Sequence, residues 1–290
     1  MTMFSVCIPF LQNEPFLREL LQSIETVENV EMEILVSQDA PVSNDLKQHF
    51  NERLHIRWLT GPNRGIAANW NNCIEHAEGE YIVLFHADDM VLPNYFDTIV
   101  NLQGLFPDSA AWFCTVNVID GDGKEISKLK DRVKRAITPR SLNFLLTGDS
   151  GLAQLLFGCF IYCPTVCYRA STLKRYRFSV NSSMVLDLDL YARLLMDGES
   201  MVGTNITGYN YRRHLDSESS VLTKTSTRFK EEIGLYNSLV ESLHALDWKR
   251  AKRQAILKVT LRLHLSLELL KSLVHLDGQR AIVLARLIIS

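Results

Sequence analysis

The stretch Tyr81-Ile-Val-Leu-Phe-His-Ala-Asp-Asp-Met-Val-Leu-Pro-Asn-Tyr95 carries the clearest fold signal in the sequence. Its apolar start, Tyr81 to Phe85, indicates a buried strand, and two adjacent carboxylates, Asp88 and Asp89, follow that strand. Pro93 then predicts the start of a helix. Carboxylate oxygens suit hard divalent cations, whose remaining ligands can be phosphate oxygens. The pair therefore predicts either a metal and phosphate site or a solvated turn in which one Asp caps the helix.

Short β-rich runs alternate with helical patterns throughout the first half of the chain. Strands separated by helices of this length indicate βαβ units and a parallel sheet. In such a sheet, ligands bind outside the carboxyl ends of the strands. The expected strands are 3–8, 33–36, 55–59 and 81–85, and the expected helices are 13–24, 43–52 and 66–76.

Polar residues therefore collect at one edge of the predicted sheet. Asp39 follows the second strand, where its carboxylate can accept the ring N–H of a uracil or thymine, or can close a turn. Arg64 lies at a loop tip before a helix N-terminus, which favours anions. Asn69 follows on that helix, and a buried amide needs the polar partners that a site at the sheet edge supplies.

Two polar clusters follow in the second half. Asp187 stands at the start of an expected helix, 187–196, where it is either a functional carboxylate or a simple cap, with Arg193 in an intrahelical charge pair. Arg212, Arg213 and His214 end an expected strand, and they either clamp a phosphate or form a solvated basic loop. The remaining expectations are strands at 110–116, 165–168, 201–206 and 209–213, a hairpin turn at 120–123, and a solvated loop or substrate-covering flap at 128–140.

The last 65 residues, 226–290, have a different character. The segment 259–269 alternates strictly between apolar and polar residues, which is typical of a strand, but its Leu-, Lys-, Arg- and Glu-rich surroundings favour a helix. We expect a helical extension. Its basic cluster 249–253 and apolar tail indicate that 249–290 docks on a membrane surface or a partner, or else that the extension caps the core.

Composition excludes several classes of function. The 290 residues include 31 Lys and Arg against 33 Asp and Glu, too few positive charges for nucleic-acid binding by bulk electrostatics. No apolar run reaches the roughly 18 residues that a membrane span needs. The N-terminus lacks the basic region of a signal peptide, which predicts a cytoplasmic protein with reduced thiols. Cys159, Cys163 and Cys167 are expected in the core and not as zinc ligands, since Pro164 interrupts any helix that would align them.

The order of these motifs resembles that of the family 2 glycosyltransferases, which have the GT-A fold. The resemblance covers roughly residues 3–220. It implies an α/β fold, with a Rossmann-like, mixed and mostly parallel sheet between helices. Its motifs are Phe4-Ser-Val-Cys-Ile-Pro-Phe-Leu-Gln-Asn-Glu14, Asp39, Asn63-Arg-Gly65, Asn69, Asp88-Asp89, Leu186-Asp-Leu-Asp-Leu-Tyr-Ala-Arg193, Tyr211-Arg-Arg-His214 and Ser217 with Ser219.

The resemblance also implies roles for individual residues. Asp187 matches the catalytic base, Asp89 the ligand of a Mg²⁺ or Mn²⁺ ion, and Arg212, Arg213 and His214 a segment near the diphosphate. Two positions depart from the family pattern, because His86 replaces an acidic residue and Ala68 a basic one. The positions that match nucleotide-binding residues are Pro9, Asn13, Asp39, Asn63, Arg64, Asn69 and Asp88.

The implied protein is an inverting glycosyltransferase. It takes a sugar from a nucleotide-diphosphate donor, UDP first and dTDP next, and gives it to a glycan or lipid-linked acceptor of a surface polysaccharide. The implied domains are a GT-A unit, 1–225, with a nucleotide-sugar half, 1–117, and an acceptor half, 118–225, followed by the extension 226–290. The cytoplasmic protein would contact the inner face of the membrane through 249–290.

Two alternatives stay open from the sequence alone. A non-catalytic module could keep the same fold to bind a nucleotide sugar or to act as a scaffold, which the departures at His86 and Ala68 favour. A sugar nucleotidyltransferase would have a similar fold. It is disfavoured because such enzymes resemble one another in a Gly-rich N-terminal loop, and the segment Phe4 to Glu14 contains no Gly.

Overall fold

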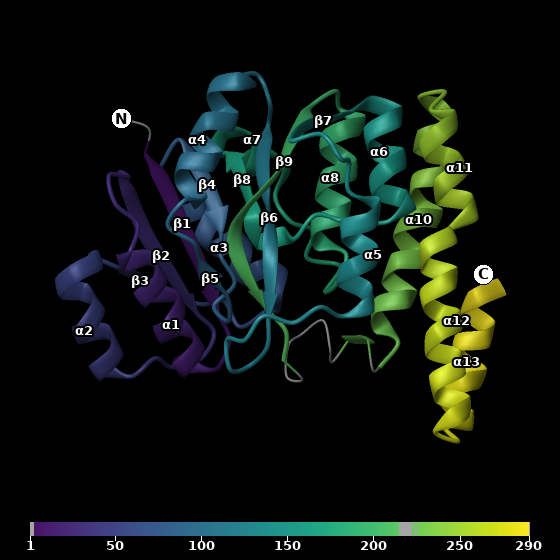
Figure 1. Ribbon diagram of the computed structural model, residues 1–290, viewed down its shortest axis with the longest axis horizontal. Helices are drawn as coiled ribbons and strands as arrows, with labels where there is room; N and C mark the ends of the chain where they lie inside the picture. The colour runs from purple at the N-terminus through teal and green to yellow at the C-terminus, as the bar shows by residue number, and fades with distance from the viewer. Residues whose placement is uncertain (1–2, 215–221, 224, 290) are drawn as a thin grey trace.

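A computed structural model of the chain describes residues 3–214, 222–223 and 225–289. Within them, one mixed sheet has the strand order β3-β2-β1-β4-β8-β6-β9-β5, and β7 pairs with β9 (Figure 1). The half β3-β2-β1-β4 is entirely parallel. The strands are β1 Phe4–Phe10, β2 Met32–Gln38, β3 Arg57–Thr60, β4 Tyr81–Leu84, β5 Met90–Val91, β6 Ala111–Ile119, β7 Asn143–Thr147, β8 Val166–Arg169 and β9 Ser200–Arg212.

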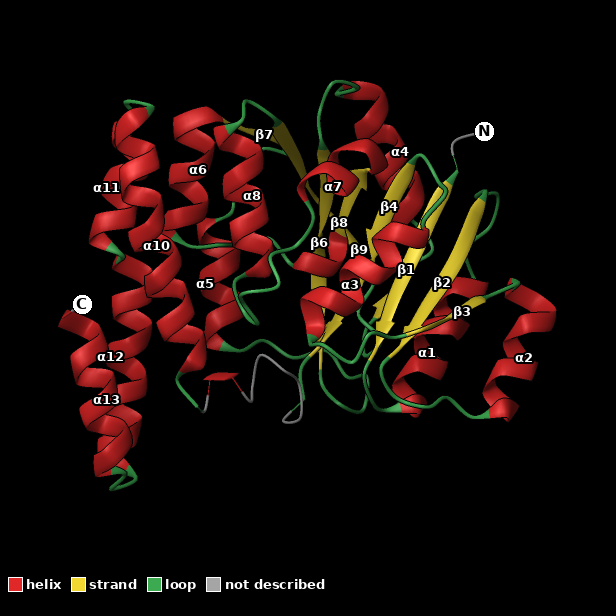
Figure 2. Ribbon diagram, turned by 180° about the vertical axis from the view of Figure 1, so that it is seen from behind, coloured by secondary structure: helices red, strands yellow, loops and turns green. Residues whose placement is uncertain are grey.

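Helices cover both faces of this sheet (Figure 2). Side chains alternate along β1, so Phe4, Val6 and Ile8 pack in a cluster with α1, α2 and α4, while Cys7 packs on the other face with α3, α6, α7 and α8. The helices are α1 Glu14–Glu25, α2 Asn44–Leu54, α3 Ile66–His76, α4 Tyr95–Leu105, α5 Leu129–Ile137, α6 Gly148–Phe157, α7 Ala170–Tyr176 and α8 Leu186–Met196.

The first half follows the sequence-based expectations closely. Asn13 caps α1 in a left-handed conformation, with its side chain accepting from the Phe16 N–H, and Ser43 caps α2. Pro9 lies within β1 and does not end it. The parallel pairing with β4 stops at Cys7, so the missing N–H of Pro9 leaves no ladder bond unmade on that side.

Two expectations for the second half were wrong. The basic segment 128–140 is not a solvated loop, because Leu129–Ile137 forms α5; its Leu, Lys, Arg and Ala residues are strong helix formers. That this segment covers a substrate stays a prediction. The two expected strands after residue 200 are one strand, β9, which absorbs the irregularity at Gly208 through register shifts against β6. The turn at 120–123 is present, but the hairpin around it is reduced to a bridge between Ile119 and Glu125.

The C-terminal extension is helical, as expected, and its two halves pack differently. Tyr236 and Leu243 of α10 and Ala251 of α11 belong to the same hydrophobic cluster as α6 and α8. By contrast, α12 and α13 form a separate cluster with Phe229 and Ile233. The helices are α10 Thr227–Ala245, α11 Lys249–Leu257, α12 Val259–Val274 and α13 Gly278–Ile289 (Figure 1).

Specific polar contacts fasten α10 and α11 to the sheet domain. The Tyr236 hydroxyl donates to the carbonyl of Leu156 at 2.8 Å. The Asp149 carboxylate accepts from the first N–H groups of α11, at Arg250 and Ala251, over 3.0 and 2.7 Å. Within the described residues, no helix combines the length and the apolar character that crossing a bilayer requires.

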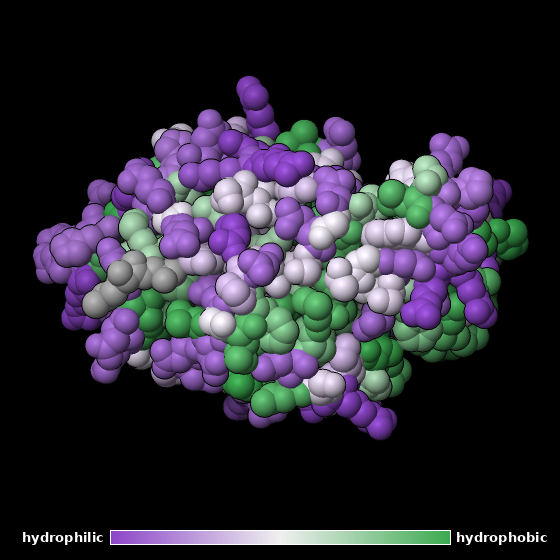
Figure 3. Space-filling view, turned by 90° about the horizontal axis from the view of Figure 1, so that it is seen from above, coloured by the Kyte–Doolittle hydropathy of each residue, from purple (hydrophilic) through white to green (hydrophobic). Residues whose placement is uncertain are grey.

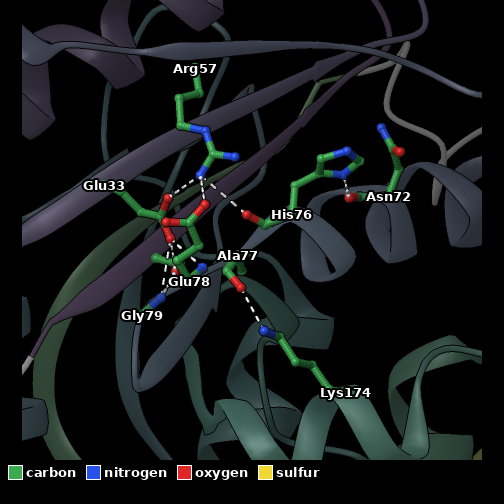
Figure 4. A network of polar contacts seen from close by, with 9 residues as sticks. Glu33, Arg57, Asn72, His76, Ala77, Glu78, Gly79 and Lys174 are labelled. Atoms are coloured by element: carbon green, nitrogen blue, oxygen red, sulfur yellow. Dashed lines mark hydrogen bonds and ion pairs between the residues drawn. The ribbon is translucent and has the colours of Figure 1, made fainter.

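The edge of the sheet where β2 begins is closed by a compact ionic network (Figure 4). The Glu33 carboxylate accepts from the Ser5 hydroxyl, from the Glu78 and Gly79 N–H groups, and from Arg57 at 2.7 Å. Burial tends to raise the pKa of Glu33, but these hydrogen bonds bring it below its ordinary value. Both oxygens of this carboxylate have hydrogen-bond partners, so Glu33 has a structural role, and the candidate functional residues lie at the other ends of the strands.

Candidate active site

The ends of β1, β2 and β3 are tied together around Asp39. Its N–H donates to the Phe10 carbonyl at 2.9 Å, and its Oδ1 accepts from the Asn63 N–H at 2.9 Å. Gly61 lies so close that a Cβ there would collide with the Asp39 carboxylate and stand 2.5 Å from the Gln38 backbone. The loop 61–63 can therefore reach Asp39 only with glycine at this position.

Helix α3 adds amide groups to the same edge. Asn69 is 3% exposed; its Nδ2 donates to the Phe10 carbonyl at 3.5 Å, and its Oδ1 has no partner within the described part of the chain. Asn13, Asn63 and Arg64 are exposed at the same ends of the elements. The structure thus gathers most of the predicted nucleotide-binding positions, and Pro9 lies beside them on β1.

The loop after β4 forms a cluster of potential metal ligands. One ligand atom each from His86, Asp88 and Asp89 lies within 4.8 Å of the others. His86 Nδ1 is 3.8 Å from Asp89 Oδ2. Both Asp89 Oδ2 and His86 Nε2 are buried without a hydrogen-bond partner among the described residues. Buried polar atoms normally have partners, so this cluster is suited to a bound cation.

The end of β9 holds this acidic loop in place. The Arg212 N–H donates to Asp89 Oδ1 at 2.7 Å, and His214 Nε2 lies 2.8 Å from Asp88 Oδ2. Burial tends to raise the pKa of Asp88, but the hydrogen bond and the charge of His214 bring it below its ordinary value. Burial and the charge of Asp88 raise the pKa of Asp89 well above its ordinary value.

The two arginines at the end of β9, Arg212 and the following Arg213, are occupied by internal partners. The Arg212 side chain is 0% exposed; it pairs with Glu19, and its Nε donates to the Asp88 carbonyl at 2.7 Å. Arg213 pairs with Asp131 of α5, its Nε lying 3.1 Å from both carboxylate oxygens. In this arrangement they position the loop, and their contact with a diphosphate stays a prediction.

Asp187 lies near the acidic loop although it comes from α8. It is the second residue of that helix, and its Oδ1 accepts from the Leu188 N–H at 2.8 Å. Burial lowers the pKa of His86, and the negative charges of Asp88 and Asp187 partly offset this lowering. Burial raises the pKa of Asp187 itself. The neighbouring Asp189 is turned away and pairs with Arg193 at 2.9 Å, four residues further along the same helix.

Several residues of the site were missed from the sequence. Trp70 packs against His86 and Phe178, at ring distances of 5.7 and 4.7 Å, and so joins α3 to the segment before α8. Lys134 of α5 donates to the Ile161 carbonyl at 3.0 Å, and its charge lowers the pKa of Asp187 against the effect of burial. The basic composition of 128–140 signalled Lys134, whereas nothing in the sequence signalled Trp70. The predicted Ser217 and Ser219 lie outside the described residues.

The sequence of the chain is similar to those of known proteins. The chain is 30% identical over 105 residues to the Minor teichoic acid biosynthesis protein GgaB of Bacillus subtilis, a match covering 34% of this chain and 12% of GgaB. These matches cover only 12–31% of the length of the curated relatives themselves.

Two solved structures share the fold at low sequence identity. Staphylococcus aureus TarS 1–349 in complex with UDP-GlcNAc aligns with a TM-score of 0.62 and 15% identity, over 83% of this chain and 66% of TarS 1–349. The mannosyltransferase PcManGT from Pyrobaculum calidifontis in complex with GDP-Man and Mn²⁺ aligns with a TM-score of 0.60 and 13% identity, over 98% and 84%. The family model described as glycosyl transferase family 2 matches residues 5–160, more than half of the sequence, and the chain therefore belongs to that family.

Proposed function

We propose that the protein transfers a sugar from a nucleotide-diphosphate donor to an acceptor hydroxyl, with inversion at the anomeric carbon. One observation carries the proposal: the half-buried carboxylate of Asp187 lies close enough to His86 of the acidic cluster for its charge to act on the pKa of that imidazole, although it comes from a different element. A base beside a cation site is the arrangement that a single displacement of a diphosphate requires.

The nucleotide would lie along the ends of β1, β2 and β3. Asp39 uses one carboxylate oxygen for the Asn63 N–H, and the other can accept the ring N–H of a pyrimidine base. Asn69 Oδ1 offers a further acceptor at the same edge. We favour UDP-sugars, and dTDP-sugars next; the UDP-GlcNAc complex of TarS supports a pyrimidine donor in this fold.

The residues of the acidic loop fit a divalent cation. Asp89 Oδ2 and an imidazole nitrogen of His86 are buried potential metal ligands, and Asp88 offers a third ligand atom within reach. When bound, Mg²⁺ or Mn²⁺ neutralises the charge that develops on the diphosphate leaving group. The Arg212 N–H holds the Asp89 carboxylate in position, and the His214 imidazole holds that of Asp88. His86 supplies nitrogen where the family often has oxygen, which favours Mn²⁺ because Mg²⁺ prefers oxygen ligands throughout.

Asp187 would act as the general base. Its carboxylate takes the proton of the acceptor hydroxyl as that oxygen bonds to the anomeric carbon, and the bond to the diphosphate breaks on the opposite side. The raised pKa makes Asp187 a better proton acceptor than an exposed aspartate. Lys134 limits this rise, because its positive charge favours the ionised carboxylate.

We further propose that the acceptor is a glycan or a lipid-linked intermediate of a surface polysaccharide. The name of GgaB, a minor teichoic acid biosynthesis protein, supports this choice. The reaction would take place on the cytoplasmic side of the membrane, with peripheral contact through 249–290.

The proposal is tested by incubating the protein with UDP-, dTDP- and GDP-sugars without acceptor. Slow release of one nucleoside diphosphate, dependent on Mn²⁺ or Mg²⁺, is expected, because water replaces the acceptor hydroxyl. Nuclear magnetic resonance of the initial sugar product checks that the anomeric configuration inverts. Tight nucleotide-sugar binding without release, even with crude glycan acceptors, would identify a non-catalytic module instead.

A further inference from the structure

Helix α12 carries two apolar faces, and only one of them is covered. Leu261 and Leu265 are buried against Phe229 and Leu284. On the opposite side, one stripe remains in solvent: Leu263, Leu267, Leu270 and Val274 are 61%, 46%, 59% and 79% exposed. The alternating sequence 259–269 is thus explained, because a helix with apolar residues at every second position presents leucines on both sides.

The exposed stripe continues around the end of the helical hairpin. Leu276, between α12 and α13, is 91% exposed, and Ile282 and Ile289 of α13 are 58% and 84% exposed. In the space-filling view, apolar residues lie among hydrophilic ones over the C-terminal helices at the right-hand end (Figure 3). A soluble monomer seldom leaves such a group of large apolar side chains in water without a binding partner.

The segment 249–290, which includes these helices, carries a net positive charge. Residues 249–290 contain nine Lys and Arg against two Asp and Glu, whereas the whole chain has 31 against 33. The segment is therefore strongly basic, and the remaining 248 residues are acidic overall. Apolar side chains beside basic ones complement a surface of anionic lipid headgroups over acyl chains.

Helix α11 adds a shallow pocket with the same chemistry. Arg250 and Arg253 line it together with Phe157, Ile137 and Ala153, and its volume is about 370 Å³. Cationic groups over apolar walls suit the boundary between a headgroup and its acyl chain. Two copies of this segment would bring like charges together, which disfavours self-association through it.

We propose that α11, α12 and α13 form a peripheral docking surface for anionic phospholipid membranes. This inference deepens the proposed function, because it states where the enzyme meets a membrane-held acceptor and which lipids it recognises. The leucine stripe would enter the interface, while the basic residues of α11 contact the headgroups.

Flotation with vesicles of phosphatidylglycerol and phosphatidylcholine tests the surface, using the full chain. The protein should float with these vesicles and should be released by about 0.5 M salt, since the attraction is partly electrostatic. Binding should be far weaker with pure phosphatidylcholine. The double variant Leu263→Gln, Leu270→Gln should lose at least tenfold in vesicle affinity, as should Arg250→Gln with Arg253→Gln.

The control variant is Leu105→Gln with Leu142→Gln, whose side chains are 58% and 61% exposed but lie outside the extension. It should float like the unchanged protein. Equal losses in both leucine variants, or an unchanged protein that stays at the bottom, would overturn the inference. So would a dimer in light scattering that Leu263→Gln, Leu270→Gln dissociates. Calorimetry with UDP separates the two proposals, because a failed nucleotide site leaves flotation intact and a failed membrane surface leaves UDP binding intact.

Discussion

At the scale of single residues, the two aspartates of α8 have opposite tasks. Burial raises the pKa of Asp187, so folding disfavours its ionised form; its contribution to stability is present at low pH and is lost as pH rises through that raised pKa. Asp189 instead forms an ion pair with Arg193, which also donates to the Tyr176 and Arg177 carbonyls at 2.7 and 2.8 Å. One carboxylate therefore costs stability, and the other contributes it.

The first prediction compares Asp187→Asn with Asp189→Asn. Asp187→Asn should lower turnover by about 10²–10⁴-fold, the usual contribution of a positioned base, while UDP affinity stays unchanged. Its unfolding free energy at pH 7 should be equal or higher, because a buried charge is removed. Asp189→Asn should instead lose about 1 kcal/mol of stability with a smaller effect on rate. Steady-state kinetics and urea unfolding measure both, and near-native turnover in Asp187→Asn would show that the base is elsewhere.

The pH dependence of the rate follows from the same residue. Since the base must be deprotonated, the acid limb of kcat/KM should lie above the ordinary range of an aspartate. The position of that limb is read from rates measured between pH 4 and 8, with a profile of nucleotide binding as the control. An acid limb at the ordinary value of an exposed carboxyl would contradict the assignment.

The third prediction concerns His86→Asp. Replacing nitrogen by oxygen should shift the preference from Mn²⁺ towards Mg²⁺ by about tenfold, because Mg²⁺ disfavours nitrogen ligands. Electron paramagnetic resonance follows displacement of bound Mn²⁺ by Mg²⁺ in the presence of UDP. The unchanged protein should also show a nitrogen hyperfine coupling that His86→Asp lacks. His76→Asp, at the exposed end of α3, is the control, and a coupling that survives in His86→Asp would exclude His86 as a ligand.

At the scale of elements, the connection between β2 and β3 depends on one close approach. Gly61→Ala places a methyl group against the Asp39 carboxylate and 2.5 Å from the Gln38 backbone, so the loop must move. We expect a loss of about 1–3 kcal/mol in stability and weaker UDP binding, since Asp39 and Asn63 separate. Gly104→Ala in α4 is the control; among the described residues, no atom beyond the adjoining residues and the nearby backbone of its own helix lies within 4 Å of the new methyl group, and stability should stay equal or rise. Melting curves and UDP titration compare the two, and equal effects would contradict the packing argument.

The elements that the sequence predicted well are those determined by local patterns. Helix α3 was expected at 66–76 and is found at Ile66–His76, because its apolar spacing and the preceding Gly65 are local signals. Strand β9 was expected in two pieces, because its continuity depends on pairing with β6, some 90 residues earlier. Local periodicity does not report such distant pairing.

The candidate site divides in the same way. The rule that ligands bind at strand ends located Asp39 and the acidic loop from the sequence alone. Arg212 was expected near a diphosphate, which stays a prediction, and its observed partners Glu19 and Asp88 lie 193 and 124 residues away in the sequence. A buried arginine and a substrate-binding arginine look alike in a sequence, because the difference lies entirely in what surrounds them.

At the scale of the whole molecule, the extension contributes in two ways, and truncation should separate them. A chain ending at Leu257 keeps α10 and α11, whose Tyr236, Leu243 and Ala251 complete the main core, so it should fold and bind UDP. A chain ending at Ser226 loses these residues and should be insoluble or lack a cooperative transition. Circular dichroism melting and UDP calorimetry measure the outcome. Loss of UDP binding in the longer truncation would show that α12 and α13 also support the core.

The contacts of β9 also determine when the protein can first bind its donor during synthesis. The acidic loop is complete in the chain soon after residue 89, but the groups that hold its carboxylates, at Arg212 and His214, come 123 and 126 residues later. A nascent chain that has left the ribosome only as far as β6 therefore lacks the Arg212 and His214 contacts that hold Asp89 and Asp88. We therefore expect nucleotide binding to appear abruptly once β9 has emerged and paired, and we expect the first half of the chain not to bind the donor on its own.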